Sequence, residues 1–204
     1  MIAYAIHATL SSRAFDRVVV STDDEEIADI ARQYGALTPF VRPSTLADDD
    51  TPTVPVIAHA IQFAQGAGWD VQEVCCVYPA VPFISTHDIL AAYAQLMASD
   101  APYVFPVTSF PSPIQRALLR HPDGSVRPFY PEFADTRTQD LEPAYFDVGQ
   151  FYWGRSTAWL DGLNVHKNGT ALVIPEWRVV DIDTHADWAR AELVYVALLA
   201  KGLV

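Results

Sequence analysis

Residues 17–35, Arg-Val-Val-Val-Ser-Thr-Asp-Asp-Glu-Glu-Ile-Ala-Asp-Ile-Ala-Arg-Gln-Tyr-Gly, place a short β-branched run directly before a segment with helical periodicity. The run at 17–21 is typical of a strand buried on both faces. Thr22 can cap the following helix, Glu25 stands three residues further on, and Gly35 can end it. A buried strand that leads straight into a capped helix is the repeating unit of α/β proteins.

The same alternation of strand and helix patterns continues along the chain. Further β-branched or aromatic runs typical of strands occur at 37–41, 73–78, 103–107, 149–153, 171–174 and 179–183. Segments with helical periodicity or helix-start signals occur at 1–13, 54–65, 86–97 and from Thr184 to near Lys201. We therefore expect an α/β fold with three layers around a mostly parallel, doubly wound sheet, in one domain that spans residues 1–204.

Residues 111–145 interrupt this alternation. They are rich in proline, arginine, aspartate and aromatic residues, and Asp123-Gly124 is a hairpin signal. We interpret this segment as an excursion from the sheet that serves as a lid or as a dimerisation arm.

Composition excludes several classes of function. Half of the 204 residues are hydrophobic, which is enough apolar material for one full core and argues against a disordered chain. The 13 basic and 25 acidic residues give a net charge of −12, and only Lys167 and Lys201 are lysines. Such a chain lacks the basic surface that nucleic acids or anionic membranes require, so neither is an expected partner.

Targeting signals and cysteine usage point to a reducing compartment. The longest uninterrupted apolar run, at 193–200, is far shorter than the roughly 20 residues needed to cross a bilayer. No basic segment precedes the first apolar stretch, as a secretory signal would require. Cys75 and Cys76 are adjacent in an apolar run, which suits neither a disulfide framework nor a zinc site. The expected location is cytoplasmic.

The strongest local chemical signal is Asp181-Ile182-Asp183-Thr184. Residues two apart on a strand point to the same side, so both carboxylates would leave the sheet together at one edge. Two such ligands could bind Mg²⁺ that is shared with a triphosphate, because Mg²⁺ usually takes few protein ligands plus phosphate and water. The alternative is that Asp183 helps to cap the last helix and Asp181 is only solvated.

Other candidate segments are less specific. Arg42 follows a predicted strand and could clamp an oxyanion, although an isolated arginine there is often a surface residue. The run at 21–24 (Ser-Thr-Asp-Asp) is explained largely by a helix cap with an acidic first turn. The hydroxyls at 48–53 could face a ligand or belong to an ordinary loop. Tyr78 and the prolines after it could shape a base or sugar wall or simply end the strand, and the aromatic residues at 151–153 could fill the core.

Together these segments resemble the cytidylyltransferases that activate nonulosonic acids, the CMP-sialic acid synthetase superfamily. The resemblance covers essentially the whole chain and rests on 15–23, on 41–43 with Asp50-Thr51, and on 181–184. The most telling segment is Gly149-Gln150-Phe151-Tyr152-Trp153-Gly154, which favours the branch that acts on pseudaminic acid. Tyr78 also matches that branch, since the sialic acid enzymes have glutamine there.

The resemblance implies CTP-dependent, Mg²⁺-assisted transfer of CMP to the anomeric hydroxyl of pseudaminic acid, with release of pyrophosphate. It implies that Asp181 and Asp183 hold the metal and share the catalysis with Arg42. It also implies which residues face the two substrates. The nucleotide would be faced by Ser21, Asp23, Arg42 and Thr51. The sugar would be faced by Tyr78, Gln150 and Tyr152. Arg116 and Arg137 would meet the sugar carboxylate, across the interface of a homodimer. The sequence does not identify a general base.

Departures from the family pattern keep alternatives open: Pro79 and Phe146 lie in segments that the family uses near the sugar, and a larger departure is at the N-terminus. The family begins with a strand and a basic Gly/Ser loop that holds the triphosphate, and Met1 aligns with the helix after that loop, so we expect the chain to be N-terminally incomplete. One alternative is a cytidylyltransferase for sialic or legionaminic acid. The other is a non-catalytic remnant that keeps the sugar-binding and dimerising surfaces but cannot hold CTP.

Overall fold

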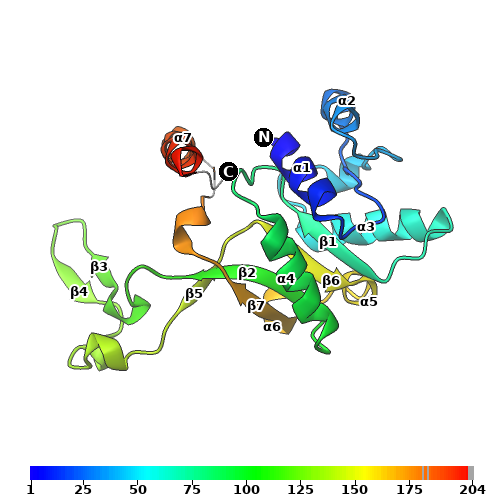
Figure 1. The fold of residues 1–204 in the computed structure, drawn as a ribbon. Helices are drawn as coiled ribbons and strands as arrows, with labels where there is room; N and C mark the ends of the chain where they lie inside the picture. The colour runs from blue at the N-terminus through cyan, green and yellow to red at the C-terminus, as the bar shows by residue number, and fades with distance from the viewer. Residues whose placement is uncertain (181, 183, 202–204) are drawn as a thin grey trace.

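The computed structural model describes residues 1–180, 182 and 184–201, and it confirms the α/β class. Its helices are α1 (Ile2–Ser12), α2 (Glu25–Gln33), α3 (Thr53–Gly66), α4 (Thr86–Met97), α5 (Ser156–Leu160), α6 (Val165–Asn168) and α7 (His185–Ala200). Its strands are β1 (Glu73–Val77), β2 (Tyr103–Ser109), β3 (Leu118–Arg120), β4 (Val126–Pro128), β5 (Tyr145–Asp147), β6 (Phe151–Arg155) and β7 (Gly169–Val173). Figure 1 shows the central sheet between helices.

The three predicted layers are present. Along β2, Tyr103 and Phe105 face the cluster that holds Ile61 of α3 and Trp159 of α5. Val104 points to the opposite face, where it packs with Ile89 of α4. This alternation follows from the two-residue period of a strand, and it explains why the strand patterns are apolar throughout.

The sheet is mixed, which corrects the expectation of a mostly parallel one. The strand order is β1-β6-β2-β5, with β7 beside β2. β6 lies antiparallel to both β1 and β2, and β5 is antiparallel to β2, so β2–β7 is the parallel ladder among the described strands. The sequence pattern could not show this, because a strand buried on both faces has the same composition in either direction.

The predicted strands at 17–21 and 37–41 run beside each other but do not join the central sheet. The amide of Val20 donates to the carbonyl of Leu37 at 2.9 Å, and the amide of Leu37 donates to that of Val18 at 2.8 Å. Only one parallel bridge, Val19–Leu37, results. A large cavity separates this pair from β1, the edge strand of the described sheet.

Helix ends show where the capping predictions hold. Asp24, rather than the predicted Thr22, caps α2, because its Oδ1 accepts from the amide of Ile27 at 3.0 Å. Thr22 instead lies buried and accepts from the amide of Asp24. The predicted cap of α7 is confirmed: Thr184 and Asp187 form a complete capping box.

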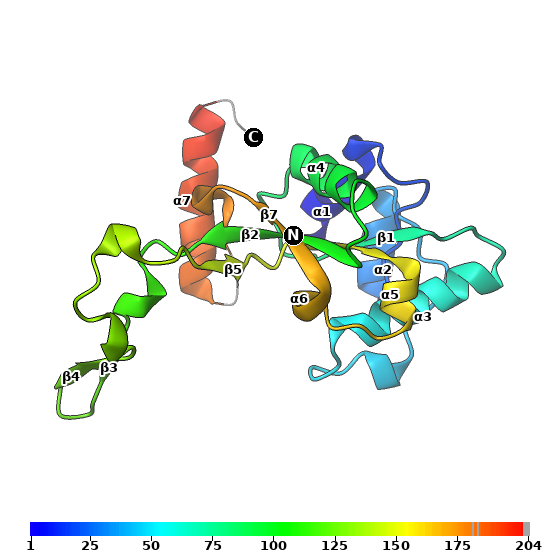
Figure 2. The ribbon, with the colours of Figure 1, turned by 90° about the horizontal axis from the view of Figure 1, so that it is seen from below.

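Residues 111–145 leave the sheet after β2 and return as β5. They contain the separate β3–β4 hairpin and short 3₁₀ turns, and they project from the body in both ribbon views (Figures 1 and 2). No helix among the described residues has both the length and the apolar composition needed to cross a membrane.

Candidate active site

A cavity of about 790 Å³ lies between α1 and the 17–22 segment on one side and β1 with α3 on the other. Its inner lining is apolar, with Ile6 of α1 and Ile61 of α3 among its residues. Ser21, Arg42 and Thr51, predicted for the nucleotide, and Tyr78, predicted for the sugar, all line this cavity. The structure thus brings four of the predicted residues to one cavity, whereas Asp23 is exposed and outside its lining.

Arg42 is held at this cavity by the neighbouring segment. Its Nε donates to Ser21 Oγ at 3.2 Å, and its Nη2 donates to the carbonyl of Ser21. The amide of Arg42 also donates to the carbonyl of Thr22 at 2.9 Å. A guanidinium carries five donors in a fixed plane, so this anchored group can still present donors to a phosphate.

Thr51 is tied into an acidic loop. Its hydroxyl donates to Asp48 Oδ1 at 2.7 Å, and the amide of Asp50 donates to the same oxygen at 3.0 Å. The hydrogen bond from Thr51 lowers the pKa of Asp48. The loop therefore stays anionic, and a nucleotide triphosphate would need cationic groups to offset it.

A second cavity of about 160 Å³ adjoins the first, because Thr53 and Tyr78 line both. Thr53 Oγ1 and the Tyr78 hydroxyl lie 2.7 Å apart. Tyr152, predicted for the sugar, lines the second cavity together with His166. The two tyrosine rings lie 5.4 Å apart, so they form a common wall.

An acidic residue outside the sequence prediction joins Tyr152 to His166. The Tyr152 hydroxyl donates to Asp147 Oδ2 at 2.8 Å, and His166 Nε2 lies 2.6 Å from the same oxygen. Burial, and secondarily the bond to Asp147, raises the pKa of Tyr152 well above its ordinary value. The phenol therefore stays protonated. Sequence reasoning missed Asp147 and His166, since nothing in their spacing indicates that β5 and α6 meet.

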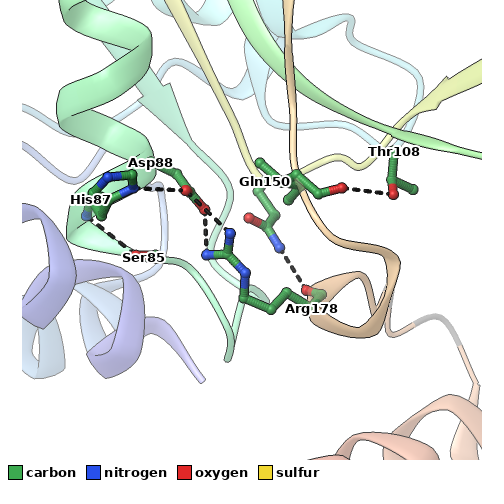
Figure 3. A network of polar contacts seen from close by, with 7 residues as sticks. Ser85, His87, Asp88, Thr108, Gln150 and Arg178 are labelled. Atoms are coloured by element: carbon green, nitrogen blue, oxygen red, sulfur yellow. Dashed lines mark hydrogen bonds and ion pairs between the residues drawn. The ribbon is translucent and has the colours of Figure 1, made fainter. Parts of the chain in front are cut away.

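Gln150 lies in a different environment from the one predicted. It lines neither cavity and is only 3% exposed. Its Nε2 donates to the carbonyl of Arg178 at 3.0 Å, whereas its Oε1 has no partner among the described residues (Figure 3). In this structure its amide anchors the segment that leads toward Asp181.

Two further contacts hold the same segment. Arg178 donates to both carboxylate oxygens of Asp88, at 2.5 and 3.2 Å, and these side chains are 17% and 6% exposed. Thr108 Oγ1 donates to the carbonyl of Ile174 at 2.9 Å. Figure 3 shows these contacts from β2, α4 and the loop before β6 converging on residues 174–178.

Arg116 and Arg137 lie on the projecting segment, outside the lining of both cavities. Arg116 donates to the carbonyls of Ala134 and Thr136, and Arg137 Nε donates to Asp140 Oδ2 at 2.8 Å. Both arginines are exposed. Within one chain the structure therefore does not bring them to the candidate substrate residues.

The predicted metal ligands Asp181 and Asp183 lie outside the described residues. Across 1–180, 182 and 184–201, no group of three or more His, Cys, Asp or Glu side chains could hold a metal ion. Thr184 is the N-cap of α7, and the capping role that one interpretation gave to Asp183 lies outside the described residues. Between the two aspartates, Ile182 packs against the cluster of Phe83, Val180 and α7.

The fold is similar to that of two solved enzymes. A solved CMP:2-keto-3-deoxy-manno-octonic acid synthetase complexed with CTP superposes with a TM-score of 0.62 at 12% identity, over 95% of this chain and 87% of that one. A 4-diphosphocytidyl-2C-methyl-D-erythritol synthase from Anaerococcus prevotii gives a TM-score of 0.58 at 14% identity, over 94% and 85%. The fold is thus that of the nucleotidyltransferases.

Sequence similarity identifies the family within that class. The cytidylyltransferase family model matches residues 1–117, and the chain belongs to this family of enzymes. It is 37% identical to the pseudaminic acid cytidylyltransferase of Campylobacter jejuni strain 81-176, over 96% of this chain and 84% of the relative. It is 28% identical to the CMP-N,N'-diacetyllegionaminic acid synthase of Legionella pneumophila, over 94% and 83%.

Proposed function

We propose that this protein transfers CMP from CTP to the anomeric hydroxyl of pseudaminic acid and releases pyrophosphate. The observation that carries the proposal is the 37% identity, over nearly the whole chain, to an enzyme named for that activity. The proposal is supported by the position of four predicted residues at one cavity, namely Ser21, Arg42, Thr51 and Tyr78.

The nucleotide would lie on the side of Arg42. Phosphoryl-type transfer depends mostly on positioning and on neutralising the charge of the phosphates. A guanidinium that is fixed by Ser21 does not need to reorganise when that charge develops. Thr51 and Ser21 would supply hydroxyl contacts beside it.

Asp181 and Asp183 would hold Mg²⁺. Two carboxylates separated by one residue are a fitting donor set, because Mg²⁺ usually binds one or two carboxylates and completes its shell with phosphate and water. When bound, the ion would neutralise charge on the triphosphate. The hydrogen bonds and the ion pair that hold residues 174–178 would fix the direction in which the chain enters this motif.

The sugar would lie on the side of Tyr78 and Tyr152. These rings line the smaller cavity and are flanked by polar groups from Thr53 and His166, which suits a hydroxylated substrate. We further propose a homodimer in which Arg116 and Arg137 reach the sugar carboxylate of the partner site. Their exposure on the projecting segment is compatible with that role.

Legionaminic acid is the second candidate acceptor, because a legionaminic acid enzyme is 28% identical over 94% of the chain. The test is pyrophosphate release from CTP and Mg²⁺ with pseudaminic, legionaminic or sialic acid as acceptor. The Campylobacter relative serves as the positive control. We expect turnover with pseudaminic acid to exceed the others at least tenfold. Preference for another sugar would overturn the substrate, and inactivity with all three would favour the non-catalytic alternative.

A further inference from the structure

The proposed reaction needs a group that removes a proton. The attacking anomeric hydroxyl becomes a phosphodiester oxygen, so its proton must leave during the step. Such a group must lie within hydrogen-bond reach of the acceptor, and a neighbouring residue should orient it. The residues that line the smaller cavity are therefore the ones to search.

We propose that His166, oriented by Asp147, is the proton acceptor for the sugar hydroxyl. This inference rests on the proposed function. His166 is the histidine that lines the smaller cavity, where Tyr78 and Tyr152 also lie. Thr53 and Tyr78 are shared with the larger cavity, so the acceptor side adjoins the nucleotide side.

The geometry fixes the imidazole in one orientation. His166 Nε2 lies 2.6 Å from Asp147 Oδ2, and the Phe105 ring packs edge-to-face against the imidazole at 5.4 Å. Asp147 is itself fixed, because Oδ1 accepts from the amide of Gly149 at 2.9 Å and Oδ2 accepts from Tyr152. A carboxylate at Nε2 favours the tautomer that donates there, which leaves the Nδ1 lone pair as the acceptor.

The neighbouring groups keep the Tyr152 phenol neutral. Tyr152 remains protonated, since burial and Asp147 raise its pKa, so it acts as a donor to Asp147 and not as the base. Other titratable or polar groups near His166 include Thr53, Tyr78 and Asn164 in the cavity. Lys167 is next in sequence. Asp147 thus stabilises the imidazolium that forms when His166 takes the proton.

The step balances without a further reactant. The anomeric oxygen forms a bond to the α-phosphorus, the bond from that phosphorus to pyrophosphate breaks, and the hydroxyl proton passes to Nδ1 of His166. The His166 side chain is 61% exposed, so the imidazolium can return the proton to water.

The test compares His166→Asn, Asp147→Asn and the control His7→Asn, which changes an exposed histidine on α1. Turnover with pseudaminic acid is measured from pH 5 to pH 9, with KM for both substrates and Tm. We expect His166→Asn to lower kcat about 100-fold or more and to remove the acidic limb of the profile, while KM and Tm change little. Asp147→Asn should lower kcat and shift that limb. His7→Asn should match the wild type.

Chemical rescue provides a second readout. In His166→Ala, added imidazole should restore part of the lost kcat, and imidazole should have no effect on His7→Ala. If the wild type is active and His166→Asn keeps kcat within threefold with the same acidic limb, the proton-acceptor role is wrong while the proposed function stands. A wild type that is inactive with every sugar overturns both.

Discussion

Arg42 shows how one residue combines two structural constraints. The guanidinium is anchored by Ser21, and the backbone of Arg42 continues the hydrogen bonds between the 18–22 and 37–42 segments. Arg17 also lines the large cavity, but its guanidinium stacks over Trp69 at 4.4 Å. The two arginines therefore form a matched pair for testing which cation serves the nucleotide.

Arg42→Met should raise the KM for CTP about 10- to 100-fold, because a charged hydrogen-bond donor to phosphate is lost. Arg42→Lys should give an intermediate value, since it keeps the charge but not the planar fork. Arg17→Met is the control and should change KM less than threefold. Equal effects of Arg42→Met and Arg17→Met on the KM for CTP would contradict the assignment.

The adjacent thiols provide a test of burial at β1. Burial raises the pKa of Cys76 to about 12 and also raises that of Cys75. At pH 8 only about one Cys76 in 10⁴ is then a thiolate, the form that reacts. Iodoacetamide should label neither cysteine in the native protein at pH 8 and both in 6 M guanidinium chloride. Rapid labelling of the native chain would contradict the raised pKa values of the two thiols.

At the scale of elements, the Asp88–Arg178 ion pair that holds residues 174–178 against α4 should contribute to stability. Asp88 is buried and Arg178 is partly buried, so removal of Arg178 leaves the Asp88 carboxylate without its main cationic partner. Arg178→Met should lower the free energy of unfolding by about 3–5 kcal/mol. Arg137→Met, which breaks an exposed pair, should cost less than about 1 kcal/mol. Urea denaturation measures the free energy of unfolding of both variants. Equal losses in the two would contradict a stabilising role for the Asp88–Arg178 pair.

The elements also show what sequence can and cannot predict. Helices with clear periodicity and start signals, such as α4 and α7, were predicted nearly to the residue. Strand direction was not predictable, because β6 is apolar whichever way it runs. The cap of α2 was assigned to Thr22 instead of Asp24, since both fit the same acidic turn.

The candidate site likewise contains residues that sequence reasoning named and residues that it missed. The family resemblance implied roles for Ser21, Arg42, Thr51 and Tyr78, and the structure brings these residues to one cavity. Asp147 and His166 are 19 residues apart and meet only because β5 and α6 come together in the fold. Gly154 of β6 is a separate case of close tertiary packing, because an added Cβ would lie 2.5 Å from Trp159 Nε1 and 2.6 Å from Tyr103 Cδ1. No local pattern encodes such tertiary contacts.

At the scale of the whole molecule, the projecting segment bears on oligomeric state. Leu118, Val126 and Phe129 are more than half exposed on it, and such apolar side chains on an extended arm are typical of a subunit contact. We expect a dimer in sedimentation-velocity experiments, and Leu118→Asp with Phe129→Asp should shift it to the monomer. A wild-type monomer at high concentration would contradict the proposed homodimer.

The central proposal is that the chain acts as a pseudaminic acid cytidylyltransferase. CTP would bind at the larger cavity and the sugar at the smaller one, and the reaction would take place where the two cavities adjoin. The most direct measurement is mass-spectrometric detection of the CMP-linked sugar after incubation with CTP, Mg²⁺ and pseudaminic acid. A parallel reaction with EDTA tests the metal requirement. We predict the CMP-linked product and equimolar pyrophosphate with Mg²⁺, and neither with EDTA. Absence of product from pseudaminic acid, under conditions in which the Campylobacter relative forms it, would contradict the claim.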